Sequence, residues 1–127
     1  MPAELEHVNY SVSDAHKTAA WMETLFGWHI RWQGEAMNGQ GHTIHVGTRD
    51  RYVALYSHAR TQPQSEDNYA TVNGLNHIAV TVDDLDSMED AVKAHGFTPK
   101  SHADYEPGRR FYFYDQDGIE YEVVSYA

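Results

Sequence analysis

Two histidines at equivalent places in an internal repeat are the residues of this chain that most directly suggest chemistry. The segment LEHVNYSVSD, residues 5–14, returns as LNHIAVTVDD at residues 75–84, so His7 corresponds to His77. A repeat at this spacing in 127 residues predicts two similar halves. If a pseudo-two-fold axis relates the halves, the imidazoles meet near it, and two imidazoles are the beginning of a metal site.

Each histidine lies in a stretch of alternating polar and apolar residues, which predicts a strand over 5–12 and another over 75–82. A helical pattern follows each strand. Helices are predicted over about 15–26 and 85–95, each with an aspartate cap before it and a terminating glycine after it: Asp14 and Gly27, then Asp84 and Gly96.

Three more strands are predicted in each half, at 28–33, 42–47 and 51–57, and at 97–102, 110–114 and 120–126. Loops are expected at 34–41 and 104–108, and the DQDG sequence at 115–118 is a strong hairpin-turn signal. Each half is therefore a β-α-β-β-β module, residues 1–58 and 74–127, and the polar stretch 59–73 is the linker.

The third and fourth strands of the halves are expected to align without a gap at an offset of 68 residues. On that alignment Glu122 corresponds to Ala54, Tyr112 to Ile44, and Arg110 to His42.

Composition excludes several classes of protein. Nine basic residues against nineteen acidic ones give a formal charge of −10, which argues against nucleic-acid binding and permits a cationic ligand or a metal ion. The chain has no cysteine, so thiolate metal sites are excluded and a reducing cytoplasm is the simplest location. No apolar run is long enough to span a membrane, and no secretory signal is expected.

The chain resembles the vicinal-oxygen-chelate superfamily, which includes glyoxalase I, extradiol dioxygenases, fosfomycin-resistance enzymes and bleomycin-resistance proteins. The resemblance rests on the histidine of each first strand, on the helix ending WMETLFGW (residues 21–28), and on the closing stretch RFYFYDQDGIEYE (residues 110–122). It implies an α+β fold in which two β-α-β-β-β modules form a curled sheet cup around a divalent metal ion.

The resemblance also implies where the metal ligands lie. The superfamily's ligand positions on the first and fourth strands fall on His7, Ala54, His77 and Glu122. Two imidazoles and one carboxylate suit Fe(II), Mn(II), Co(II), Ni(II) or Zn(II) with positions left open for a chelating substrate. Ala54 cannot bind a metal, and glyoxalase I uses a carboxylate there as ligand and base. Glu120 is the competing carboxylate, but its place near the turn predicts a solvated role.

Further residues are candidates for proton transfer and substrate binding. His42 and His45 are predicted on opposite faces of one strand, so at most one of them faces the cup. The predicted catalytic residues are Tyr112, His45 and His58. The predicted substrate contacts are Asn9, Tyr56, Arg110 and Tyr114, with Arg110 able to donate to an anionic substrate. His102 lies close to the position of the extradiol acid–base histidine, but its spacing is wrong.

The sequence thus predicts a divalent-metal-dependent enzyme that acts on a small oxygenated substrate chelating the ion. The lack of a carboxylate at Ala54 favours dioxygenase-like chemistry over the glyoxalase I lyase reaction. The alternative is a non-catalytic protein that sequesters a cationic drug or small molecule, which the charge of −10 would suit. A homodimer is expected, because members of the superfamily commonly exchange modules between chains.

Overall fold

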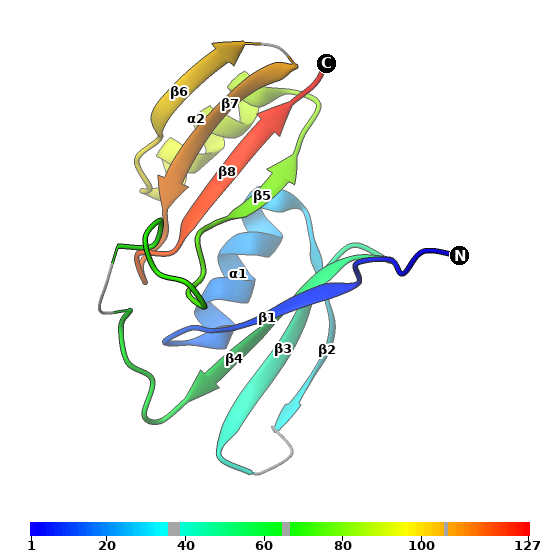
Figure 1. Ribbon diagram of the computed structural model, residues 1–127, viewed down its shortest axis with the longest axis vertical. Coiled ribbons are helices and arrows are strands. Elements are labelled where there is room, and N and C mark those ends of the chain that lie inside the picture. The colour runs from blue at the N-terminus through cyan, green and yellow to red at the C-terminus, as the bar shows by residue number, and fades with distance from the viewer. Residues whose placement is uncertain (36–38, 65–66, 106) are drawn as a thin grey trace. The chain divides into compact units, whose positions relative to one another are not determined.

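The computed structural model describes residues 1–35, 39–64, 67–105 and 107–127. The chain divides into two compact units, Met1–Gln62 and Pro63–Ala127. The predicted loops at 34–41 and 104–108 and the predicted linker each include residues outside the described ones. Each unit is a four-stranded mixed sheet with one helix (Figure 1).

The first unit has the strand order β1-β4-β3-β2. Its elements are β1 (His7–Ser11), α1 (Ala15–Phe26), β2 (His29–Glu35), β3 (Gly41–Gly47) and β4 (Tyr52–His58). β1 runs parallel to β4, and the other neighbours are antiparallel. The predicted β-α-β-β-β order is confirmed.

The second unit repeats this topology in the order β5-β8-β7-β6. Its elements are β5 (Ile78–Thr81), α2 (Leu85–His95), β6 (Lys100–Tyr105), β7 (Gly108–Tyr114) and β8 (Glu120–Ser125). The first strand is again parallel to the last. One expectation was wrong in detail: Asp104 and Tyr105, predicted in a loop, continue β6 and pair with Arg109 and Gly108 of β7.

The predicted residues cap both ends of both helices. Asp14 accepts hydrogen bonds from the backbone amides of His16 and Lys17, and Asp84 accepts one from Ser87. Gly27 and Gly96 adopt φ angles of 69° and 111° after the helices, a conformation that a side chain would strain. Short-range chemistry therefore sets both helix boundaries.

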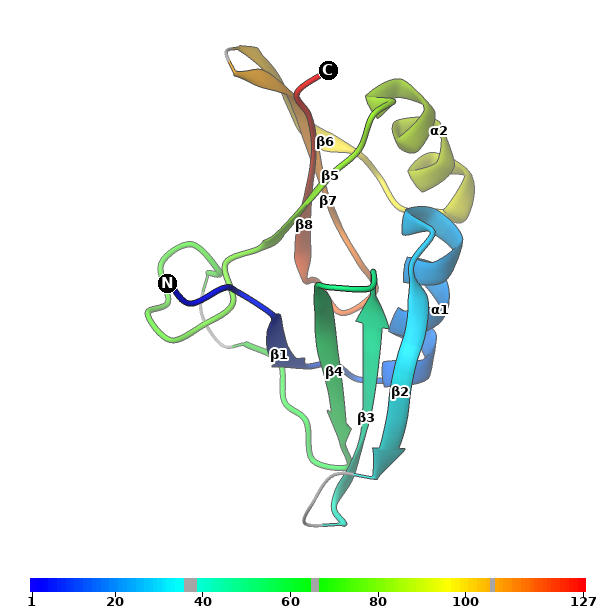
Figure 2. The ribbon, with the colours of Figure 1, turned by 90° about the vertical axis from the view of Figure 1, so that its right-hand side faces the viewer.

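Each helix covers one face of its own sheet and leaves the other face free of helix (Figure 2). In the first unit the covered face buries Met22 and Leu25 of α1 against Ile44 and Leu55. In the second unit it buries an aromatic stack in which Phe113 lies 5.5 Å from both Phe97 and Tyr121, measured between ring centroids. Because strand side chains alternate, the polar residues between these core positions share the uncovered face.

Strand register corrects the predicted alignment of the two units by one residue. Ala54 pairs with His45 on β3, whereas Glu122 pairs with Tyr112 on β7. Ala54 also pairs with Asn9, and Glu122 with Ala79, so Ala54 and Glu122 do correspond. The ungapped alignment of the third strands was wrong, because the β7–β8 turn is one residue longer than the β3–β4 turn. Tyr112 therefore corresponds to His45, and Arg110 to Thr43.

No helix among the described residues is both long and apolar enough to cross a membrane.

Candidate functional site

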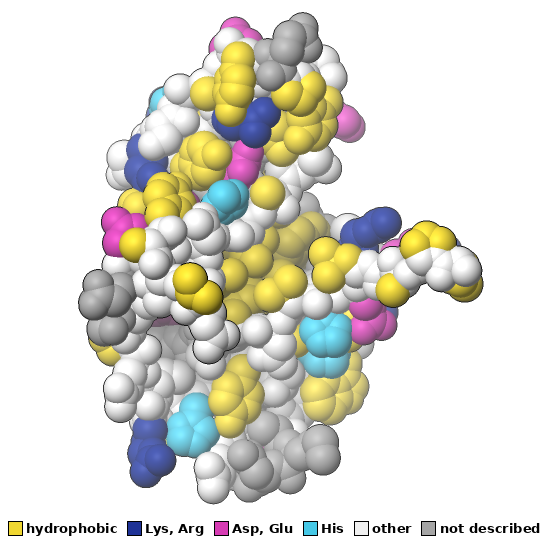
Figure 3. All heavy atoms as spheres, viewed as in Figure 1, with side chains coloured by type: hydrophobic (Ala, Val, Ile, Leu, Met, Phe, Trp, Pro, Cys, Tyr) yellow, Lys and Arg dark blue, Asp and Glu magenta, His cyan; other side chains and the backbone are white. Residues whose placement is uncertain are grey.

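A row of polar side chains lies on the uncovered face of the second unit. His77 Nε2 lies 3.0 Å from one carboxylate oxygen of Glu122, and Arg110 Nη1 donates to the other oxygen at 2.8 Å. Figure 3 shows a basic, an acidic and a histidine side chain side by side on this face. The Glu122 side chain is 9% exposed and that of Arg110 14%, so the ion pair is largely removed from solvent, where charge interactions are strong.

The His77 ring is fixed from both sides. Its Nδ1 donates to the side-chain oxygen of Asn76 at 2.6 Å, while Nε2 faces Glu122. An amide oxygen only accepts hydrogen bonds, so the Nδ1 proton is held by Asn76. Nε2 and a carboxylate oxygen of Glu122 therefore face one another, and a divalent ion bound here would take the place of a proton between them.

Glu120 is the most deeply buried polar group in this row, with 1% exposure. It accepts hydrogen bonds from Lys100 at 2.7 Å and from Asn68 at 3.0 Å. Burial opposes its ionisation, but Lys100, Tyr69 and Asn68 together hold the pKa of Glu120 below its ordinary value. The predicted solvated role of Glu120 was wrong, because the segment containing Asn68 and Tyr69 packs over it.

An irregularity in β6 brings Lys100 and Tyr105 to the uncovered face together. The register of β6 against β7 shifts between Lys100 and Ala103, and Ser101 between them has a φ of 54°. In a regular strand residues 100 and 105 would point to opposite faces. With the bulge, Lys100 lies 4.3 Å from the Tyr114 ring centroid and Tyr105 lies 4.9 Å from the Arg110 guanidinium.

Tyr112 lies beside the His77–Glu122 pair. Its ring meets that of His77 edge-on, with 5.6 Å between centroids. Burial and then the charge of Glu122 raise the pKa of the Tyr112 hydroxyl, so the hydroxyl keeps its proton at neutral pH. Of the residues predicted for the second unit, the structure brings together His77, Arg110, Tyr112 and Glu122. Tyr114 lies two residue pairs farther along β7 and β8.

The uncovered face of the first unit carries a cluster of rings instead of ion pairs. The Tyr52 ring packs against both His7 and His45, with centroid distances of 4.9 and 4.7 Å, and the two imidazoles are themselves 6.3 Å apart. His7 Nδ1 donates to Glu6 at 2.8 Å, and the Tyr52 hydroxyl donates to the same oxygen at 3.2 Å. Burial first, and then the charges of His7 and Arg31, lower the pKa of His45. His45 is therefore a neutral imidazole at neutral pH.

The other residues predicted for the first unit spread along the same face. Asn9 pairs with Ala54, next to His45, whereas Tyr56 pairs with Thr43 farther along the sheet. His58 ends β4 and contacts Gln40 and the backbone amide of Arg60. Six residues of strand separate it from Tyr52, roughly 20 Å, so His58 does not join the cluster around His7.

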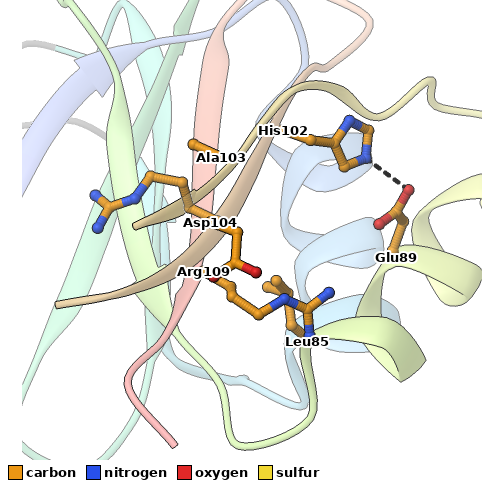
Figure 4. Close-up of a pocket in the computed structure, with 7 residues that line it drawn as sticks. Leu85, Glu89, His102, Ala103, Asp104 and Arg109 are labelled. Atoms are coloured by element: carbon orange, nitrogen blue, oxygen red, sulfur yellow. Dashed lines mark hydrogen bonds and ion pairs between the residues drawn. The ribbon is translucent and has the colours of Figure 1, made fainter. Parts of the chain in front are cut away.

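Two other histidines lie on the helix-covered faces. His42 stacks on His16 of α1, which confirms that His42 and His45 face opposite ways. His102 donates to Glu89 of α2 at 2.8 Å. Figure 4 shows His102 and Glu89 lining an open pocket between α2 and β6, together with Asp104 and Arg109. His102 therefore lies on the opposite face of its sheet from Glu122.

Comparison with known proteins identifies the family. The model of the Glyoxalase/Bleomycin resistance protein/Dioxygenase superfamily matches residues 4–123. The chain belongs to this superfamily. A search of curated proteins gave no match.

Solved structures of the superfamily share the fold. A glyoxylase/bleomycin resistance protein/dioxygenase domain from Frankia sp. EAN1pec is 19% identical, with a TM-score of 0.81 over 98% of this chain and 93% of that one. The fosfomycin resistance protein FosX from Mesorhizobium loti is 24% identical, with a TM-score of 0.74 over 98% and 92%. FosX from Listeria monocytogenes, solved with Mn(II) and sulfate, is 22% identical, with a TM-score of 0.75 over 98% and 93%. The glyoxalase-like fold is thus confirmed.

The residues of the second unit fit a divalent ion. Two ligand atoms at right angles around an ion, each bonded at about 2.1 Å, are about 3.0 Å apart, and His77 Nε2 and Glu122 Oε1 are separated by 3.0 Å. Imidazole with carboxylate is also a donor set for Fe(II), Mn(II) or Zn(II). Within the described ranges no three His, Asp or Glu residues converge; His7 belongs to the first unit.

Several contributors to this candidate site were missed in the sequence. Glu6 and Asn76 each precede a candidate ligand histidine and accept its Nδ1 proton. A side-chain oxygen next to a repeated histidine was the available signal. Lys100 and Tyr105 gave no such signal, because the bulge that turns them to this face is not encoded in a periodic pattern.

Proposed function

We propose that this protein is a divalent-metal-dependent enzyme acting on a small oxygenated substrate that chelates the ion. His7, His77 and Glu122 would hold the metal. The observation that carries the proposal is repeated in both units: the residue before each histidine accepts its Nδ1 proton, which leaves Nε2 for a ligand bond. A histidine of purely structural role needs no such arrangement twice.

When bound, the ion would act as a Lewis acid on adjacent substrate oxygens. The residues around it can then be given separate roles. Tyr112 and His45 are the proposed proton-transfer groups, since the first keeps its proton and the second is neutral at pH 7. Arg110 is proposed to donate to an anionic oxygen of the substrate, because only one of its hydrogen-bonding groups is engaged by Glu122 and its buried Nε has no partner among the described residues.

The remaining predicted residues have weaker support. Asn9, Tyr56 and Tyr114 share the uncovered faces and are proposed as substrate contacts. His58 stays a candidate for proton transfer only if the substrate extends along β4. Dioxygenase-like chemistry is favoured over the lyase reaction because Ala54 supplies neither a ligand nor a base.

Metal analysis tests the proposal first. Chelator-stripped protein is loaded with Mn(II), Fe(II), Co(II), Ni(II) or Zn(II), and bound metal is measured by mass spectrometry beside variants H7A, H77A and E122A. We expect one ion per site in the wild type and loss of most binding in each variant. Glu89→Gln serves as the control, since Glu89 contacts a histidine on the helix-covered face. Equal affinity in wild type and E122A would contradict the ligand assignment.

Activity assays then separate the reaction classes. Oxygen uptake with catechol-type substrates on the Fe(II) form is compared with hemithioacetal conversion on the Ni(II) and Zn(II) forms. Uptake of oxygen supports the favoured reaction. Inactivity in both assays, together with tight binding of a drug-like cation, would instead assign the protein to the sequestering branch of the superfamily.

We also propose a homodimer with two equivalent sites, each taking His7 from one chain and His77 with Glu122 from the other. This proposal is supported by the exchange of modules between chains that is common in the superfamily, and by the closed two-fold symmetry that such an exchange gives. Light scattering at micromolar concentration should give twice the chain mass of 14.5 kDa. A monomer mass would rule this assembly out.

A further inference from the structure

We propose that Tyr52 and Glu120 are positioning residues that fix the ring orientation of His7 and His77. The inference rests on the proposed metal-binding role of the two histidines. It concerns residues that touch neither the metal nor the substrate and that act through their neighbours.

Tyr52 and Glu120 occupy equivalent positions in the two units. Tyr52 pairs with His7 across the parallel strands β1 and β4. In the second unit Ile78 pairs with Tyr121, so the same parallel register extended by one residue sets His77 level with Glu120. Each histidine therefore has a polar partner beside it at the start of the last strand of its sheet.

In the first unit the connection from Tyr52 to His7 is short. The Tyr52 hydroxyl donates to Glu6 Oε1 at 3.2 Å, and the same oxygen accepts the Nδ1 proton of His7 at 2.8 Å. The Tyr52 ring also lies flat against the imidazole, with an interplanar angle of 15°. Tyr52 thus limits the tilt of the His7 ring by direct contact. It also limits the rotation of that ring, because it holds the Glu6 oxygen to which His7 donates.

In the second unit the connection passes through the segment before β5. Glu120 accepts from Asn68 Nδ2 at 3.0 Å, and this amide also donates to the backbone oxygen of Asn76 at 2.6 Å. Asn76 in turn holds the Nδ1 proton of His77. The second carboxylate oxygen of Glu120 is fixed by Lys100 at 2.7 Å. Asn68, which lies in the predicted linker 59–73, is therefore part of the site.

A purely stabilising role explains these residues poorly. Buried ion pairs such as Glu120–Lys100 are often matched or exceeded in stability by apolar residues of similar volume. In the first unit the acceptor Glu6 has a 64% exposed side chain, and exposed polar contacts contribute little to stability. Two chemically different groups occupy one equivalent position, and each is connected to the residue that holds Nδ1: Tyr52 to the side-chain oxygen of Glu6, and Glu120 through Asn68 to the backbone oxygen of Asn76. This points to orientation of the histidine as their shared effect.

The test uses Tyr52→Phe for the first unit and Asn68→Ala for the second, with Glu120→Gln as an additional variant. Tyr52→Phe keeps the stacked ring, and Asn68→Ala keeps the Glu120–Lys100 pair, so both are expected to fold. Nitrogen-15 NMR of the histidine rings in metal-free protein reports the tautomer of His7 and His77. Calorimetric titration with Co²⁺ alone reports affinity, and thermal unfolding reports stability.

We expect each variant to lower the Nδ1-protonated population of its own histidine only, and to weaken Co²⁺ binding about 10-fold. The unfolding midpoint should change little in Tyr52→Phe. Glu89→Gln should leave both rings and the Co²⁺ affinity unchanged, because Glu89 lies on the helix-covered face. Unchanged ring tautomers in both Tyr52→Phe and Asn68→Ala would overturn the proposal, whatever the affinity does. Failure of the wild type to bind Co²⁺ would overturn the proposed function, while the ring tautomers would still test the positioning.

Discussion

The two units share one topology but differ in what lies on the uncovered face of the sheet. In the first unit the face around Ala54 carries a cluster of three rings, those of His7, His45 and Tyr52. In the second unit the equivalent region carries buried ion pairs built on Glu120 and Glu122. A repeated backbone can therefore keep its apolar core between helix and sheet while the residues on the uncovered face diverge. The core residues must pack together and exclude water, and the residues on the uncovered face need not.

The largest effect is expected when the first unit receives, at Ala54, the carboxylate that the second unit has at Glu122. With Ala54 in place, we expect poor conversion of hemithioacetals by Ni(II)- or Zn(II)-loaded protein, because a positioned base contributes about 10²–10⁴-fold in rate. Ala54→Glu should raise that rate. Robust turnover by the unaltered protein would refute this reading of Ala54. Ala54→Gln, which adds the same volume without a base, is the matched control.

The converse change gives the second unit the residues of the first. Glu122→Ala leaves the partly exposed Arg110 without its anion and should lower the free energy of unfolding. Because Arg110 corresponds to Thr43, the double variant Arg110→Thr/Glu122→Ala should recover part of that loss. Chemical denaturation measures both. A double variant less stable than Glu122→Ala alone would show that the ion pair is not the source of the cost.

The turns after the third strands differ in a way that pH should reveal. Burial raises the pKa of Asp115 to about 6, whereas in an unfolded chain it is about 3.9. The folded state then binds more protons than the unfolded state between these values, so stability should fall as pH rises from about 4 to 6, by roughly 2 kcal/mol. Asp115→Asn, which can still accept the backbone amides of Asp117 and Ile119, should abolish this fall. Denaturation midpoints of the wild type and the variant are measured across that pH range. If the variant lost stability with rising pH as the wild type does, the prediction would be contradicted.

The smallest expected difference concerns the helix caps. Asp14 accepts two backbone amides and Asp84 one, so Asp14→Ala should cost slightly more than Asp84→Ala, with each near 1 kcal/mol. Thermal unfolding of the two variants gives the ranking. The reverse order would mean that tertiary packing, rather than the cap, holds the start of α1.

The sequence by itself determined the features that depend on near neighbours along the chain. The repeat around His7 and His77, the aspartate caps and the glycine ends of both helices were all predicted, because capping and strand alternation act over a few residues. The family also followed from the sequence. The correspondence of Glu122 with Ala54 was predicted too, since both lie at matching places in the last strand of their units.

Only the tertiary structure decided which polar residues meet. The longer β7–β8 turn shifted Tyr112 into the place of His45, and the bulge after Lys100 turned that lysine toward Glu120. Glu120 was expected in solvent and is buried, because residues far away in the chain fold over it. Register shifts, bulges and long-range burial depend on pairing between segments, so no local pattern in the sequence could have fixed them.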